Sequence, residues 1–145
     1  MQQQFYLYDT NFILYVFVLT FTIGLVMGSF INCVAWRIAN GEEFIRGRSH
    51  CPICGHTLTP FELIPVVSYV LQRGRSRCCH EKISLRYPAT ELLVGFVFVG
   101  LMYKFGLRLD CLMFMVFALI LLAIALVDLE TGIIPDGLIL AGMIN

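Results

Sequence analysis

Charged side chains are scarce in this 145-residue chain and are missing altogether from two long segments. Only 14% of the residues are charged, while 59% are hydrophobic, which is far from the balance of soluble domains. No Asp, Glu, Lys or Arg occurs in residues 10–36 or in residues 111–127. Runs of this length without charge exclude an ordinary soluble domain and predict an all-α integral membrane protein.

A basic N-terminus is also lacking, because the chain begins Met1-Gln2-Gln3-Gln4. A signal peptide starts with positive charge, has a shorter apolar core and ends at a small-residue cleavage site. These features do not fit the first apolar segment. We therefore expect that segment to be a membrane helix rather than a signal peptide.

Three apolar segments have about the length needed to cross a bilayer as helices, at residues 11–36, 89–103 and 111–127. A fourth apolar segment, residues 137–145, is too short to cross. We expect three transmembrane helices plus the start of a fourth, and we interpret the chain as a truncated product or an N-terminal fragment. Glycines within the segments are expected to permit close helix packing. They are Gly24, Gly28, Gly95 and Gly100.

The basic residues predict an orientation in the membrane. Eight of the ten lie between Arg37 and Arg86. By the positive-inside rule, the loop of residues 37–88 is predicted to be cytoplasmic and the N-terminus to lie outside. Topology then accounts for the basic excess, so we expect the lipid bilayer, and no nucleic acid, as a partner. The oligomeric state is left open.

A single carboxylate, Asp128, closes the apolar run of residues 111–127. At ~1.5 Å per helical residue this run covers about 25 Å, slightly less than a bilayer core of roughly 30 Å. Asp128 is therefore expected at the cytoplasmic edge of the membrane. Ionisable groups in such places are costly and more often functional than structural, which makes Asp128 a candidate catalytic residue. A merely solvated helix end is the alternative.

Four of the six cysteines fall in the predicted loop. Cys51-Pro-Ile-Cys54 is a tight knuckle of the kind that places two thiolates on one tetrahedral Zn²⁺. Cys78 and Cys79 follow later in the loop, but Ser76 stands where a second pair of the same spacing would begin. The predicted metal ligands are Cys51, Cys54, Cys78 and Cys79.

The fourth ligand of this site is open, because His80 or His56 offers a nitrogen in place of the Cys78 sulfur. Free thiols in a reducing cytosol are the alternative to a metal site. If zinc binds, we expect its role to be structural, because a loop with few apolar residues gains little stability from its own core.

The remaining polar residues have structural interpretations. Asn32, within the first segment, is expected to bond to a neighbouring helix. Pro88 and Glu91 match the chemistry of a helix start, with the acid near the positive end of the helix dipole. Glu130 is expected to face water. The apolar residues 61–71 are too short to span and are predicted to form a packed or interfacial segment.

Several distinctive blocks follow one another along the chain. They read GSFINCVAWR at 28–37, SHCPICG at 49–55, LIPVVSY at 63–69, ISLRYPATELL at 83–93, and D with IPD at 128 and 134–136. Together they resemble the type IV prepilin peptidase family, membrane aspartic proteases of pilus, secretion and competence systems. The resemblance divides the chain into an N-terminal segment with the first helix (1–36), the cytoplasmic cysteine loop (37–88) and the later helices (89–145).

The resemblance implies that Asp128 is the first catalytic aspartate. The family's second aspartate belongs to a Gly-x-Gly-Asp motif that these 145 residues do not contain. An aspartic protease needs two carboxylates that share a proton. Asp136 lies about 12 Å further along a continuous helix, so we do not expect it to replace the missing acid.

The implied substrates are prepilins or pseudopilins of type IV pilus and type II secretion systems. They would be cleaved after a glycine at the cytoplasmic face of the bacterial inner membrane. Family members also methylate the new N-terminus with S-adenosylmethionine. The alternative is a non-catalytic membrane module that binds prepilin or assembly partners, while the near absence of charge in the spans disfavours a transporter fragment.

Overall fold

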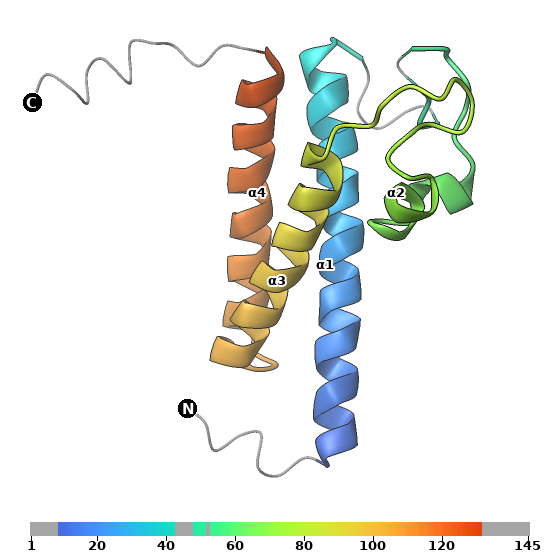
Figure 1. Ribbon diagram of the computed structural model, residues 1–145. Coiled ribbons are helices and arrows are strands. Elements are labelled where there is room, and N and C mark those ends of the chain that lie inside the picture. The colour runs from blue at the N-terminus through green and yellow to red at the C-terminus, as the bar shows by residue number, and fades with distance from the viewer. Residues whose placement is uncertain (1–8, 43–47, 52, 132–145) are drawn as a thin grey trace, which may run out of the picture.

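The computed structural model describes residues 9–42, 48–51 and 53–131. Three long helices dominate this part of the chain: α1 (Thr10–Ala39), α3 (Arg86–Phe105) and α4 (Leu109–Thr131). The connection between α1 and α3 contains two short elements, the 3-10 helix η2 (Pro60–Leu63) and α2 (Val67–Leu71). Figure 1 shows α1, α3 and α4 side by side, with the connection folded against one end of α1.

The helical prediction is confirmed for the described residues, which contain only two isolated β-bridges and no strand. All three long helices are long and apolar enough to cross a membrane. Their 30, 20 and 23 residues correspond to about 45, 30 and 34 Å. The predicted fourth apolar segment and Asp136 lie outside the described residues.

Each helix extends beyond the apolar run that predicted it. Helix α1 continues through Arg37 to Ala39, and α3 begins at Arg86, three residues before the predicted start. Hydropathy marks only the part of a helix that suits lipid. The backbone hydrogen bonds continue until a residue such as Gly106, with φ 66°, ends them.

Small residues hold α1 and α3 together at close range. A Cβ atom added to Gly24 would lie 2.7 Å from the Cα of Gly95, and one added to Gly28 would lie 2.9 Å from the Cα of Glu91. Such close backbone approach supplies the van der Waals contact that drives helix association in lipid. The packing role is thus confirmed for Gly24, Gly28 and Gly95. It is wrong for Gly100, which has no atom within 4 Å of such a Cβ.

Gly24→Ala is expected to destabilise the protein by about 1–3 kcal/mol, because its methyl group would overlap the α3 backbone. Gly100→Ala is the matched control and should be neutral or slightly stabilising, since Ala favours the helix and has room. Thermal unfolding of both variants in detergent measures the difference. Equal stabilities for the two variants would contradict the observed packing.

Helix α4 completes the bundle along one side only. Leu126 is 2% exposed and packs against Ile31 and Ala35 of α1. Near the other end of the helix, Cys111 and Met115 join a cluster with residues of α3. In the most apolar 18-residue stretch of each helix, 11% is buried in α4 and 33% in α3. Most of the surface of α4 is therefore available to lipid or to further protein.

Candidate functional site

The first cysteine knuckle is shaped by backbone hydrogen bonds. The N–H of Cys51 donates to His56 O at 2.8 Å, and the N–H of Gly55 donates to Cys51 O at 2.9 Å. Gly55 adopts φ 70°, a left-handed conformation that suits glycine. This turn brings Cys51 and Cys54 to the same side of the loop.

The second pair of cysteines, Cys78 and Cys79, lies in a turn formed by residues 76–81 and has no intervening residues. The N–H of Ser76 donates to Glu81 O at 2.8 Å, and the N–H of His80 donates to Ser76 O at 3.0 Å. His80 itself has φ 57°. The turn presents Cys78 and Cys79, although they are adjacent in the sequence, to the first knuckle.

The four cysteine sulfurs gather in one place, all within 4.8 Å of one another. Sulfurs held tetrahedrally at about 2.3 Å from zinc lie roughly 3.8 Å apart. The Sγ–Sγ distances are 3.8 Å for Cys51–Cys79, 3.9 Å for Cys78–Cys79 and 3.0 Å for Cys54–Cys78. The donor set therefore fits a zinc ion. Among the described residues the cluster contains neither His56 nor His80, so the structure brings Cys78 to the fourth position.

The thiol pKa values diverge within this cluster. Backbone N–H groups, above all that of Cys54, lower the pKa of Cys51 to about 6 by stabilising its thiolate. The hydrogen bond with Cys54 raises the pKa of Cys78 to about 12. Four sulfurs this close cannot all carry negative charge unless a cation lies among them. The four cysteines are therefore arranged so that they could hold a metal ion.

A network of polar groups lies where α1 meets the start of α3. Asn32 is 3% exposed and donates to Thr90 Oγ1 and to Tyr87 O, so its predicted bonding to a neighbouring helix is confirmed. Arg86 forms an ion pair with Glu130 of α4. The prediction that Glu130 faces water is wrong, because this pair draws it between the helices.

Glu91 was predicted to lie at the start of a helix, and the structure gives it a different position. Because α3 begins at Arg86, Glu91 lies in the second helical turn and not at the helix start. Its side chain is buried, and Oε2 accepts a hydrogen bond from the Val66 N–H at 2.7 Å. Val66 adopts φ 61°, which is rare for a β-branched residue. Glu91 therefore fixes a turn of the loop against α3.

Asp128 lies in the last turns of α4, two residues before Glu130 and thus close to the level at which α3 begins. Its side chain is exposed. It is not part of the network around Asn32 or of the cysteine cluster. Asp128 lies near the C-terminal end of α4, which is at the same end of the helix bundle as the loop, although α1 stands between α4 and the loop (Figure 1).

A cavity of about 400 Å³ opens between α1, the start of α3 and the loop. No pattern in the sequence predicted it, because its walls come from segments distant in the chain. Its lining includes Asn32, Trp36, His50, Tyr69, Lys82 and Glu91.

Residues 22–105 match the family model described as the bacterial peptidase A24 N-terminal domain. A protein of Myxococcus xanthus named prepilin leader peptidase/N-methyltransferase is 38% identical over 88% of this chain and 38% of its own length. A Bacillus subtilis protein of the same name is 37% identical over 83% of this chain and 48% of its own length. The chain thus spans about half, or less, of the curated relatives it matches. No solved structure matches.

An Escherichia coli relative carries a different name, type 4 prepilin-like proteins leader peptide-processing enzyme. It is 33% identical over 78% of this chain and 49% of its own length.

Proposed function

Since this chain belongs to the bacterial peptidase A24 family, we propose that it functions as a prepilin leader peptidase. The observation that carries the proposal is the position of Asp128 in the last turns of a helix suited to cross a membrane. A prepilin joins a basic leader to a hydrophobic membrane helix, so its scissile bond lies where lipid meets water. We expect a carboxylate at the end of α4 to lie at the depth of such a bond.

In this proposal Asp128 is one half of a catalytic pair. One carboxylate accepts a proton from the attacking water while the other donates a proton to the scissile carbonyl. Glu130 does not fit the second role. Two residues of helix rotate it about 200° from Asp128, and it is paired with Arg86. The second acid of the pair comes from outside the described residues.

The other features of the chain have supporting roles in the proposal. Zinc held by the four cysteines would stabilise the loop and take no part in cleavage. The relatives' names extend the proposal to N-methylation of the new N-terminus, with S-adenosylmethionine as methyl donor. The basic residues support a cytoplasmic loop and an outside N-terminus in the bacterial inner membrane.

The proposal is tested by complementation. The complete protein encoded by the gene is expressed, together with a prepilin, in bacteria that lack their own prepilin peptidase. We expect mature pilin, detected by its smaller size and by the mass of its N-terminal peptide, which also reports methylation. An uncleaved prepilin beside a protein correctly inserted in the membrane would refute the proposal and favour the non-catalytic module.

A further inference from the structure

The short segment of residues 60–71, which contains η2 and α2, has two chemically different faces. Its polar side chains Glu62, Ser68 and Tyr69 line the cavity beside α1 and α3. Its most exposed apolar side chains point away from the protein. The exposed fractions are 76% for Phe61, 49% for Val67, 64% for Val70 and 78% for Leu71.

This apolar face lies at the depth of the membrane helices and not beyond their ends. Val66 is bonded to Glu91, five residues or about 7.5 Å inside the start of α3. Tyr69 lines a cavity with Ser29, which is ten residues or about 15 Å before the end of α1. Figure 1 shows α2 beside α1, beyond the first turn of α3 on the side toward the middle of the bundle.

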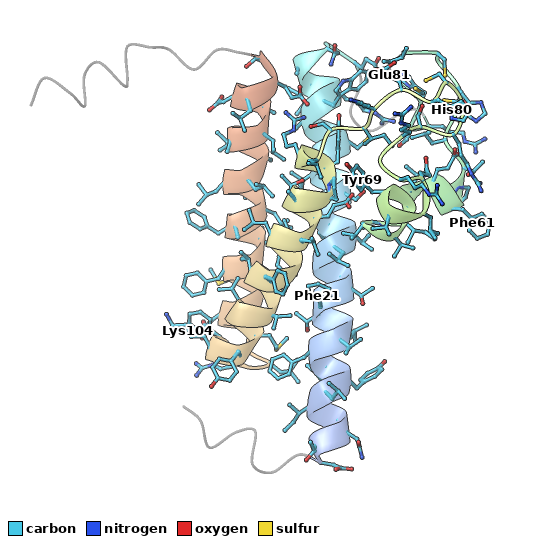
Figure 2. The ribbon with its side chains drawn as sticks, in the orientation of Figure 1. Phe21, Phe61, Tyr69, His80, Glu81 and Lys104 are labelled. Atoms are coloured by element: carbon cyan, nitrogen blue, oxygen red, sulfur yellow. The ribbon has the colours of Figure 1, made fainter. Side chains whose placement is uncertain are left out.

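The labelled side chains show how the loop is arranged along the bundle. In Figure 2, Phe61 lies nearer than His80 or Glu81 to the level of Phe21, which is in the middle part of α1. The loop thus has one end near the tips of the helices and another that reaches back along them. Where the adjoining part of α1 or α3 lies within the bilayer, an outward apolar side chain of this segment would have lipid rather than water as its solvent.

Positive charge follows the apolar face directly. Arg73, Arg75 and Arg77 come immediately after α2, and all three are exposed. A polar inner face, an apolar outer face and adjoining basic residues are the features of elements that lie in the interface of a bilayer with anionic lipids.

We propose that residues 60–71 are inserted in the lipid boundary on the loop side of the membrane, with Phe61, Val70 and Leu71 among the acyl chains. The arginines that follow contact anionic headgroups. The capping box in which Glu62 Oε2 accepts hydrogen bonds from the Thr59 N–H and hydroxyl, each at 2.8 Å, satisfies the polar end of η2. Glu91, through Val66, sets the depth of the insertion. The loop thereby has a second attachment to the bilayer besides its two flanking helices.

Fluorescence quenching tests this insertion, because Trp36 is the single tryptophan of the chain. In a Trp36→Phe background, Phe61→Trp and Leu71→Trp are made separately, and the full chain is placed in vesicles of phosphatidylcholine and phosphatidylglycerol. We expect phospholipids brominated near the headgroup end of their acyl chains to quench both probes by about twofold, since interfacial elements sit about 5–10 Å deep. Phospholipids brominated near the bilayer centre should quench less.

Glu81→Trp in the same background is the matched control, because Glu81 is exposed, belongs to the same loop and lies near the tips of the helices (Figure 2). It should be quenched by aqueous iodide and not by brominated lipid. Arg73→Gln with Arg75→Gln should reduce quenching of the Phe61→Trp probe only when phosphatidylglycerol is present.

Quenching of Phe61→Trp and Leu71→Trp by iodide alone would show that the segment faces water. Insensitivity to both quenchers would show that a second copy or another protein covers it. Either outcome overturns the proposal. Because these readouts need no prepilin, they are independent of the proposed peptidase function.

Discussion

Asp128→Asn is expected to abolish prepilin cleavage in the complete protein, with a rate loss of about 10²–10⁴-fold if Asp128 acts in proton transfer. The amide keeps the size of the carboxylate but neither accepts nor shares a proton. Because the Asp128 side chain is exposed, the substitution should leave folding and membrane insertion intact. The fraction of prepilin cleaved over time in isolated membranes, normalised to the amount of enzyme, measures the effect.

Asp110→Asn is the matched control for this experiment. Asp110 is on the same helix, in its first turn, where it is 53% exposed and 3.0 Å from the Arg108 guanidinium. The same replacement of Asp by Asn at the other end of α4 should leave the rate of prepilin cleavage near that of the protein without substitutions. Normal cleavage by the Asp128→Asn protein would remove Asp128 from the catalytic pair. Equal losses in both variants would indicate a general effect of charge on α4.

The membrane helices could be predicted because lipid imposes a simple rule on the sequence. A segment that crosses the bilayer must be apolar over about 20 residues, and α1 and α4 satisfy this without a charge in their central parts. Close helix packing at Gly24 and Gly95 was also predictable, since small residues permit such an approach, but their pairing with each other was not. The helix ends were less predictable, because backbone hydrogen bonding continues beyond the apolar run.

The environments of Glu91 and Glu130 could not be predicted from local patterns. Glu91 is bonded to a residue 25 positions earlier, and Glu130 to one 44 positions earlier. Both contacts depend on the path that the loop and α3 take through space. From the neighbouring sequence alone, Glu91 was predicted to lie at a helix start and Glu130 to face water. The burial of Glu91 and the ion pair of Glu130 arise only after the helices pack.

The four cysteines predicted as metal ligands do lie together, although Cys78 and Cys79 do not follow the usual spacing of two intervening residues. The rule of two intervening residues points to position 76, which is a serine whose Oγ lies 3.0 Å from Cys79 Sγ. The Sγ atom of Cys78, the residue directly before Cys79, joins the sulfur cluster instead, and the turn ends at His80, which has a left-handed conformation. The structure thus brings a fourth sulfur to the cluster without the spacing that the rule requires. The residue types could therefore be predicted, but not the means by which they meet.

Cys54→Ser is expected to remove bound zinc and to unfold the loop between α1 and α3. Among the described residues of that loop before Pro88, only Cys51 is buried, so hydrophobic burial contributes little to its stability. Structural zinc sites in small domains supply about 10 kcal/mol or more of apparent folding free energy. Loss of one of four thiolates should therefore expose the loop while α1, α3 and α4 remain packed against one another.

Elemental analysis of the purified protein should find about one zinc per chain before the substitution and little after it, as expected for a four-thiolate site. Limited proteolysis should then cut the loop far faster, and a chelator should have the same effect on the unsubstituted protein. Cys33→Ser is the matched control, because Cys33 lies on α1 outside the sulfur cluster. It should retain both zinc and protease resistance. Undiminished zinc in the Cys54→Ser protein would mean that the metal is held elsewhere, because three thiolates and a serine hydroxyl make a much weaker site than four thiolates.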